Sequence, residues 1–172
     1  MDLKQLRRRC EARLRELDLP IPFDVHAFGE ALARQRGRPI RLQPVAGGTR
    51  FYGLWVATPA ADVVLYECRT SRLHQDHIIL HELCHVACGH EPAPVAAEEA
   101  TQLLFPDVRP EPVQRLLRRA GSPTDEEFEA ELLASLILER AAGDVPLDAA
   151  PLGAEVAQVL GRLEATLEDG SS

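Results

Sequence analysis

The sequence has no apolar run long enough to cross a membrane. No stretch approaches the roughly 18–20 consecutive apolar residues that a membrane-spanning helix needs. The N-terminus reads MDLKQLRRRCEARLREL and lacks the apolar segment of a secretory signal. Cysteine is scarce, and its spacing does not resemble the disulfide framework of a secreted domain, since it occurs only as Cys10, Cys68, Cys84 and Cys88. We therefore expect a cytoplasmic protein that makes no contact with a membrane.

Basic residues are also fewer than acidic residues. Against 27 acidic residues there are 19 Lys and Arg, so the formal net charge is -8. Nucleic-acid binding needs clustered positive charge, and this balance excludes nucleic acid as the main partner. The triplet Arg7–Arg9 then indicates a solvated helix face rather than a phosphate-binding patch. The charge favours a basic partner or substrate.

What is present is the composition of a folded globular chain. Hydrophobic residues make up 45% and charged residues 27% of the 172 residues. A chain of this length fits one domain and can bury a core without disulfides. We therefore treat residues 1–172 as a single domain whose core spans about residues 20–142.

The pattern of apolar and turn residues predicts an α+β fold. Helices are expected over residues 3–19, from the N-cap Asp24 to about Arg36, and over 71–90 between the N-cap Ser71 and the stop signal Gly89. Between them we expect a small, mostly antiparallel sheet of about three strands, separated by turn residues that include Pro44: Ile40–Leu42, Phe51–Ala57 and Asp62–Glu67. Further helices are expected over 95–104, 112–120, 123–142 and 152–168.

The motif His81-Glu82-Leu83-Cys84-His85 points to a metal site. Two histidines at i and i+4 lie on one face of a helix, one turn apart, and can bind the same zinc ion. The glutamate between them is placed to take a proton from water. On a helical wheel, Ile79, Leu80, Leu83, Val86 and Ala87 form a separate apolar back. We therefore predict His81 and His85 as zinc ligands and Glu82 as the general base.

Other metal-binding residue types leave alternatives open on the same helix. His74 and His77 extend the histidine stripe. We expect plain surface histidines, with contact to the metal ligands or to substrate as the alternative, whereas His90 is a candidate third ligand. Cys84 and Cys88 raise the alternative of a closed structural zinc site. One helix face cannot surround an ion tetrahedrally with all four groups, so packing residues beside the site are the preferred reading of the two cysteines.

Glu129 is our predicted third ligand. The predicted N-cap Ser122 and first-turn Pro123 begin its helix. On a wheel starting at Phe128, Glu129 lies within an apolar arc while Glu131 faces solvent. A carboxylate in an apolar face needs a compensating cation. A salt bridge, for example to Arg140, and Glu126 as the ligand remain the alternatives.

Two segments resemble one known family. His77–His90 is similar to the active-site helix of the ImmA/IrrE metallo-endopeptidases, and Glu129–Ser135 is similar to the helix that supplies their third zinc ligand. Leu133 stands where that second helix usually carries Phe. The resemblance covers about residues 20–142. It implies a zincin-like fold, Glu129 as a ligand, and helix-turn-helix transcriptional repressors as substrates.

Together these observations predict a zinc-dependent endopeptidase that acts on a regulatory protein. In such an enzyme zinc polarises the peptide carbonyl, and Glu82 passes a proton from water to the leaving amine. The alternative is a non-catalytic binding partner of a helix-turn-helix regulator, either an antirepressor or a toxin–antitoxin component, with a structural zinc. Retention of Glu82 favours the enzyme, because a structural site needs no base.

Overall fold

The computed structural model describes residues 2–46, 53–92 and 125–143. Helix α1 (Leu3–Glu16) starts at Asp2, whose side chain accepts a hydrogen bond from the backbone of Lys4. Helix α2 (Val25–Arg36) is capped by Asp24 and ends at Gly37, which has a φ of 65°. Both predicted N-terminal helices are confirmed, although α1 is three residues shorter than expected at its C-terminal end.

The sheet has three strands in the order β1-β3-β2. These are β1 (Ile40–Val45), β2 (Gly53–Ala57) and β3 (Asp62–Glu67). A short turn joins β2 to β3, so these two pair antiparallel, whereas β1 pairs parallel with β3. The sheet is therefore mixed, and the prediction of a mostly antiparallel sheet is corrected.

Pro44 lies inside β1 rather than in the turn predicted from the sequence. Strand β1 is at the edge of this three-stranded sheet, where a residue without a backbone N–H costs no ladder hydrogen bond on the open side. The central strand β3 is the most buried part of the sheet, with Val63, Val64 and Leu65 fully inaccessible to solvent.

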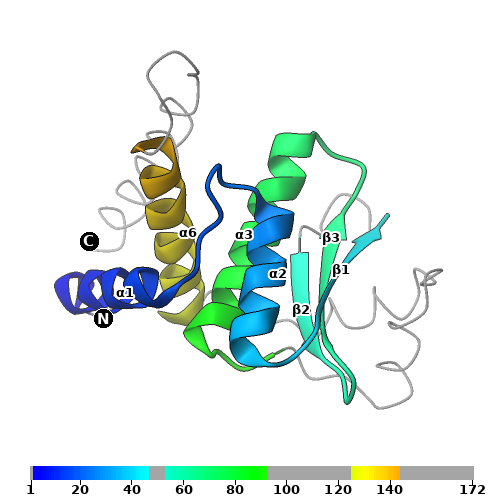
Figure 1. The fold of residues 1–172 in the computed structure, drawn as a ribbon, viewed down its shortest axis with the longest axis horizontal. Helices are drawn as coiled ribbons and strands as arrows, with labels where there is room; N and C mark the ends of the chain where they lie inside the picture. Colours follow the sequence, from blue (N-terminus) through cyan, green and yellow to red (C-terminus); the bar gives the residue numbers. More distant parts are fainter. Residues whose placement is uncertain (1, 47–52, 93–124, 144–172) are drawn as a thin grey trace, which may run out of the picture.

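Helix α3 (Arg72–Cys88) is the centre of the fold (Figure 1). It packs against β2 and β3 on one side and against α6 (Asp125–Gly143) on the other, and α1 packs across α6. The predicted caps of α3 are confirmed: Ser71 accepts a hydrogen bond from the His74 backbone, and Gly89 has a φ of 74°. The sequence prediction of an α+β fold is thus confirmed at this level.

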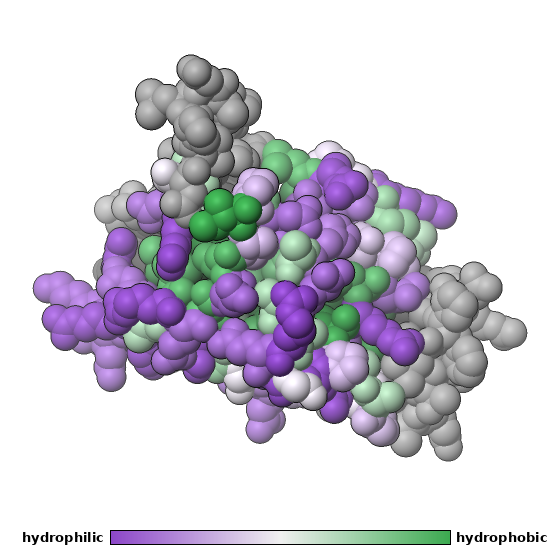
Figure 2. Space-filling view, in the orientation of Figure 1, coloured by the Kyte–Doolittle hydropathy of each residue, from purple (hydrophilic) through white to green (hydrophobic). Residues whose placement is uncertain are grey.

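The buried core lies where α3 meets its neighbours. Leu83 of α3 and Leu133, Ala134 and Ile137 of α6 have no exposed surface. Figure 2 shows that hydrophilic residues cover the part of this face formed by α1, in agreement with the exposure of Arg7, Arg8 and Arg9.

Several sequence predictions fall outside the described residues. These are the helices expected over 95–104, 112–120 and 152–168 and the N-terminal signal at Ser122 and Pro123. Within residues 2–46, 53–92 and 125–143, no helix has the length and apolar character to span a bilayer.

Candidate metal centre

The histidine stripe of α3 faces a carboxylate stripe on α6. His77, His81 and His85 follow one another at intervals of four residues, which places them on one face of α3. Glu127 and Glu131 repeat the same interval on α6. Glu127 approaches His81 and His85, and Glu131 approaches His81 and His77. The pairing shows that the two helices run antiparallel, with three histidines of α3 facing two carboxylates of α6.

The Nε2 atoms of His81 and His85 lie 3.1 Å apart and point into one space. Glu127 closes this space: its Oε2 is 3.3 Å from His81 Nε2, and its Oε1 is 3.5 Å from His85 Nε2. These three side chains form a group that could hold a metal ion, with ligand atoms all within 4.8 Å of one another. Two imidazoles and one carboxylate are the donor set of many catalytic zinc sites, in which a fourth position stays open.

Glu129 does not belong to this group, so the structure does not bring the predicted third ligand to the two histidines. Its carboxylate is held by Arg9 of α1, with Arg9 Nε to Oε1 at 3.0 Å and Arg9 Nη2 to Oε2 at 2.7 Å. The alternative of a salt bridge is thus correct in kind, although the partner is Arg9 and not Arg140. Glu126, the other alternative, is exposed and lies outside the group.

The rotation of α6 about its axis explains why Glu127 and not Glu129 faces the histidines. The fully buried positions Ala130, Leu133, Ala134 and Ile137 define the core face of α6, whereas Phe128, the start of our wheel, is only partly buried. Measured from Ala130, Glu127 lies at about 60° on one side and Glu129 at about 100° on the other. The core stripe therefore separates them, and each carboxylate meets a different helix.

The outward nitrogen of each histidine ring also has a partner. Nδ1 of His81 lies 3.0 Å from Oε2 of Glu131, which was expected to face solvent but is mostly buried. Nδ1 of His85 lies 2.9 Å from Nδ1 of His90. Hydrogen-bond partners on the ring nitrogen that faces away from the ion orient metal-binding histidines. His77 approaches the other oxygen of Glu131, whereas His74 lies outside the group.

The electrostatics of the group favour a cation. Burial lowers the pKa of His81, but hydrogen bonds with Glu127 and Glu131 outweigh it and raise the pKa to about 10. Hydrogen bonds with His81 and His85 hold the pKa of Glu127 well below its usual range. The cluster thus binds a proton tightly in the space between its donors. A divalent ion held by both Nε2 atoms and Glu127 would leave both rings neutral, and Nδ1–H of His81 could then donate to Glu131, so the residues fit a metal.

Glu82 lies beside the group, between α3 and strand β2. Burial raises the pKa of its carboxyl, while the neighbouring His81 and His85 and a backbone hydrogen bond from Trp55 lower it, with a net rise. Gly53 of β2 makes this arrangement possible. A Cβ at that position would lie 2.6 Å from Glu82 Oε1 and 2.7 Å from Ile78 Cγ2, so only glycine lets the strand approach the helix this closely.

The thiols are not placed as ligands. Cys84 is fully buried in the core, and burial raises its pKa well above the ordinary value. Burial likewise raises the pKa of Cys88 to about 12. The group that could hold a metal ion in the described part of the chain contains no cysteine. This arrangement disfavours the closed Cys/His site and agrees with the prediction that both cysteines are packing residues.

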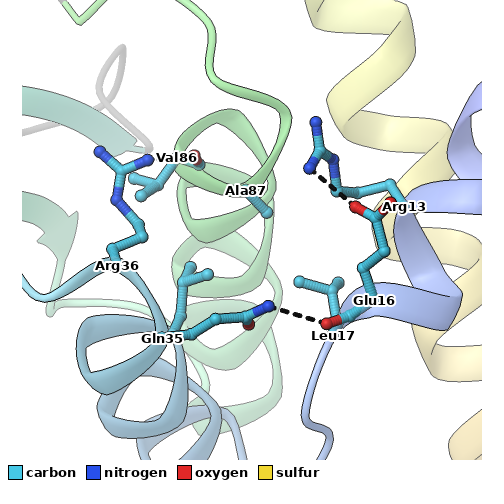
Figure 3. A pocket seen from close by; sticks show the side chains of 8 residues that line it. Arg13, Glu16, Leu17, Gln35, Arg36, Val86 and Ala87 are labelled. Carbon is cyan, nitrogen blue, oxygen red and sulfur yellow. Dashed lines mark hydrogen bonds and ion pairs between the residues drawn. The ribbon is translucent and has the colours of Figure 1, made fainter.

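A separate cavity of about 140 Å³ lies between α1, α2 and the back of α3 (Figure 3). Its polar side chains already have partners within the chain. Arg13 contacts Glu16, Gln35 donates to the Glu16 carbonyl, and Arg36 donates to the Val86 carbonyl. The cavity is therefore a packing gap between helices, and it is distinct from the candidate metal centre.

Comparison with known proteins adds no family to this picture. No protein-family model, curated protein or solved structure matches the chain. What the site does must therefore be inferred from its own residues.

Proposed function

We propose that this chain is a zinc-dependent endopeptidase with a zincin-like arrangement of its active-site helix. The observation that carries the proposal is the convergence of His81 Nε2, His85 Nε2 and the Glu127 carboxylate, with Glu82 adjacent on the same helix. Zinc held by these three groups would supply a Lewis acid that acidifies water and polarises a peptide carbonyl.

Glu82 is the proposed general base. Its carboxyl is partly buried, and the rise in its pKa brings it closer to the range in which a carboxylate can accept a proton and return it at neutral pH. Gly53 and the Trp55 backbone hold this carboxylate from the strand side. We therefore assign proton transfer from water to the leaving amine to Glu82.

The proposed substrate is a helix-turn-helix transcriptional regulator. The resemblance of His77–His90 to the active-site helix of the ImmA/IrrE family supports this class of substrate, and the net charge of -8 suits a protein with a basic DNA-binding face. Association between such partners is expected to weaken as salt is added.

The experiment is co-expression with a helix-turn-helix regulator encoded beside the gene, followed by inspection for a cleavage product. We expect zinc-dependent cleavage by the wild-type chain and a loss of several orders of magnitude in Glu82→Gln, which keeps the fold and the metal. Glu126→Gln, an exposed carboxylate near the site, is the control. Cleavage by Glu82→Gln at the wild-type rate would refute the enzyme, and binding without cleavage would favour the non-catalytic partner.

A further inference from the structure

On the side of its ring away from the metal centre, His85 contacts a row of three side chains from three segments: His90, Glu129 and Arg9. His90 follows the C-cap of α3, and its backbone N–H donates to the His85 carbonyl at 3.2 Å. Its ring meets that of His85 edge-on, with the centroids 5.0 Å apart. On the far side, Nε2 of His90 lies 3.5 Å from Oε2 of Glu129. Arg9 donates hydrogen bonds to both carboxylate oxygens of Glu129.

The proposed metal at one end of this row and the Glu129 carboxylate at the other fix which ring nitrogens of His85 and His90 carry a proton. A His85 ring that offers Nε2 to a metal must be neutral and carry its proton on Nδ1. That N–H can then donate to Nδ1 of His90 at 2.9 Å, which requires His90 to carry its own proton on Nε2. Nε2 of His90 is buried and has no hydrogen-bond partner within the described residues, and Glu129 offers it a carboxylate at ion-pair distance. Both imidazole N–H groups, of His85 and of His90, thus point away from the metal centre, and Arg9 donates to Glu129 from the far end.

We propose that His90, Glu129 and Arg9 are positioning residues that hold His85 in the metal-binding tautomer and orientation. The inference rests on the proposed metal site, and it gives Glu129 a role other than that of a ligand. It also assigns a role to α1, which lies outside the HExxH helix: Arg9 neutralises Glu129, whose side chain is only 17% exposed, where an unpaired carboxylate would be costly.

The comparison with His81 shows why a relay is needed. His81 receives a carboxylate directly, since Glu131 reaches its Nδ1 at 3.0 Å. Glu129 lies on the opposite side of the core stripe of α6 and reaches His85 only through the ring of His90. The two metal ligands therefore have equivalent outer carboxylates, one direct and one relayed by an imidazole.

The test measures zinc affinity by chelator competition for wild type, His90→Phe, Glu129→Gln and the double variant. We expect each single variant to bind zinc about 10–100-fold more weakly than wild type. The double variant should be no weaker than His90→Phe, because Glu129 acts through His90. Arg9→Gln should also weaken binding, with recovery in Arg9→Lys. Arg7→Gln is the control, since Arg7 pairs only with Glu11 on the same helix surface in the described residues.

A second readout does not depend on zinc. Nitrogen NMR of the metal-free chain should show His85 protonated on Nδ1 in wild type and a mixture of tautomers in His90→Phe. Wild-type affinity in both single variants, additive losses in the double variant, or an unchanged His85 tautomer would overturn the relay. Loss of zinc in Glu129→Gln as complete as in Glu127→Ala would also overturn it, because Glu129 would then be a ligand. Failure of the wild-type chain to bind zinc would instead refute the proposed function, while the tautomer measurement would still test the relay.

Discussion

The two faces of α3 are built from opposite residue types and held by opposite forces. The back of the helix carries Ile79, Leu80 and Leu83, which are buried in the core and are stabilised by their removal from water. The front carries His77, His81 and His85, whose neighbours are carboxylates of α6. Burial alone stabilises the back, whereas the front needs a proton or a cation between its donors. Changes on one face should therefore affect stability and those on the other metal binding.

The largest expected effect is on the front face. Glu127→Ala removes the only carboxylate that faces both Nε2 atoms in the described structure. Zinc affinity should fall by more than about a hundred-fold, beyond the usual effect of removing a residue that only hydrogen-bonds to a ligand. The fold should survive, because this side chain is 49% exposed. Metal content by mass spectrometry and circular dichroism on the purified variant check both statements. Glu126→Ala is the matched control, and an equal loss of zinc there would contradict the assignment of Glu127.

The back face should respond in the opposite way. Leu83 has no exposed surface, and Leu83→Ala should lower the free energy of unfolding by about 2–5 kcal/mol through lost burial and the cavity left behind. Zinc content at a temperature where the variant is folded should stay at the wild-type level. Leu73→Ala, on the same helix with 49% exposure, should change stability by less than about 1 kcal/mol. Denaturant unfolding measures both variants. Equal losses in the free energy of unfolding would mean that α3 does not pack with Leu83 in the core and Leu73 at the surface.

Local rules predicted this helix well. Ser71 and Gly89 mark its ends because a side-chain cap and a left-handed glycine act within one turn of the chain. The division into two faces also follows from the sequence, because the helical repeat alone fixes which residues share a face. His81, Glu82 and His85 could be chosen as candidates for the same reason.

The partner across the site could not be chosen in this way. Whether Glu127 or Glu129 meets the histidines depends on how α6 is rotated about its axis, which its packing between α1 and α3 decides. One signal was available: Glu127 and Glu131 repeat the four-residue interval of the histidines. Gly53 was a second signal, for the approach of β2 to α3, since a lone glycine within a strand marks a close approach of another element. The parallel pairing of β1 with β3 depends on strand order, which no local pattern specifies.

Gly53 of β2 lies against both Glu82 and the buried Ile78 of α3, so a change there should affect both stability and hydrolysis. Gly53→Ala would push a methyl group into Glu82 and into the branched Ile78, which cannot swing away. We expect a loss of about 1–3 kcal/mol in stability from overpacking, together with weaker peptide hydrolysis as Glu82 is displaced. Gly143→Ala is the control, because its added Cβ would meet no atom of the described residues within 4 Å. Thermal unfolding and hydrolysis rates that are equal for the two variants would show that β2 does not need this close approach.

The last expected effect is a pH dependence confined to the front face of the metal-free chain. The folded pKa of His81 is about 10, above its ordinary value of 6.5, because Glu127 and Glu131 outweigh the opposing effect of burial. A raised pKa means that the stabilisation is complete below pH 6.5 and is lost as the pH rises toward 10. The free energy of unfolding of chelator-treated protein should therefore fall between about pH 6.5 and 8.5, by at most about 1.4 kcal/mol per pH unit. Denaturant titrations should show a shallower slope in His81→Gln and in the zinc-loaded chain, where the ion takes the place of the proton. An equally steep slope in His81→Gln would place the titrating group elsewhere than between α3 and α6.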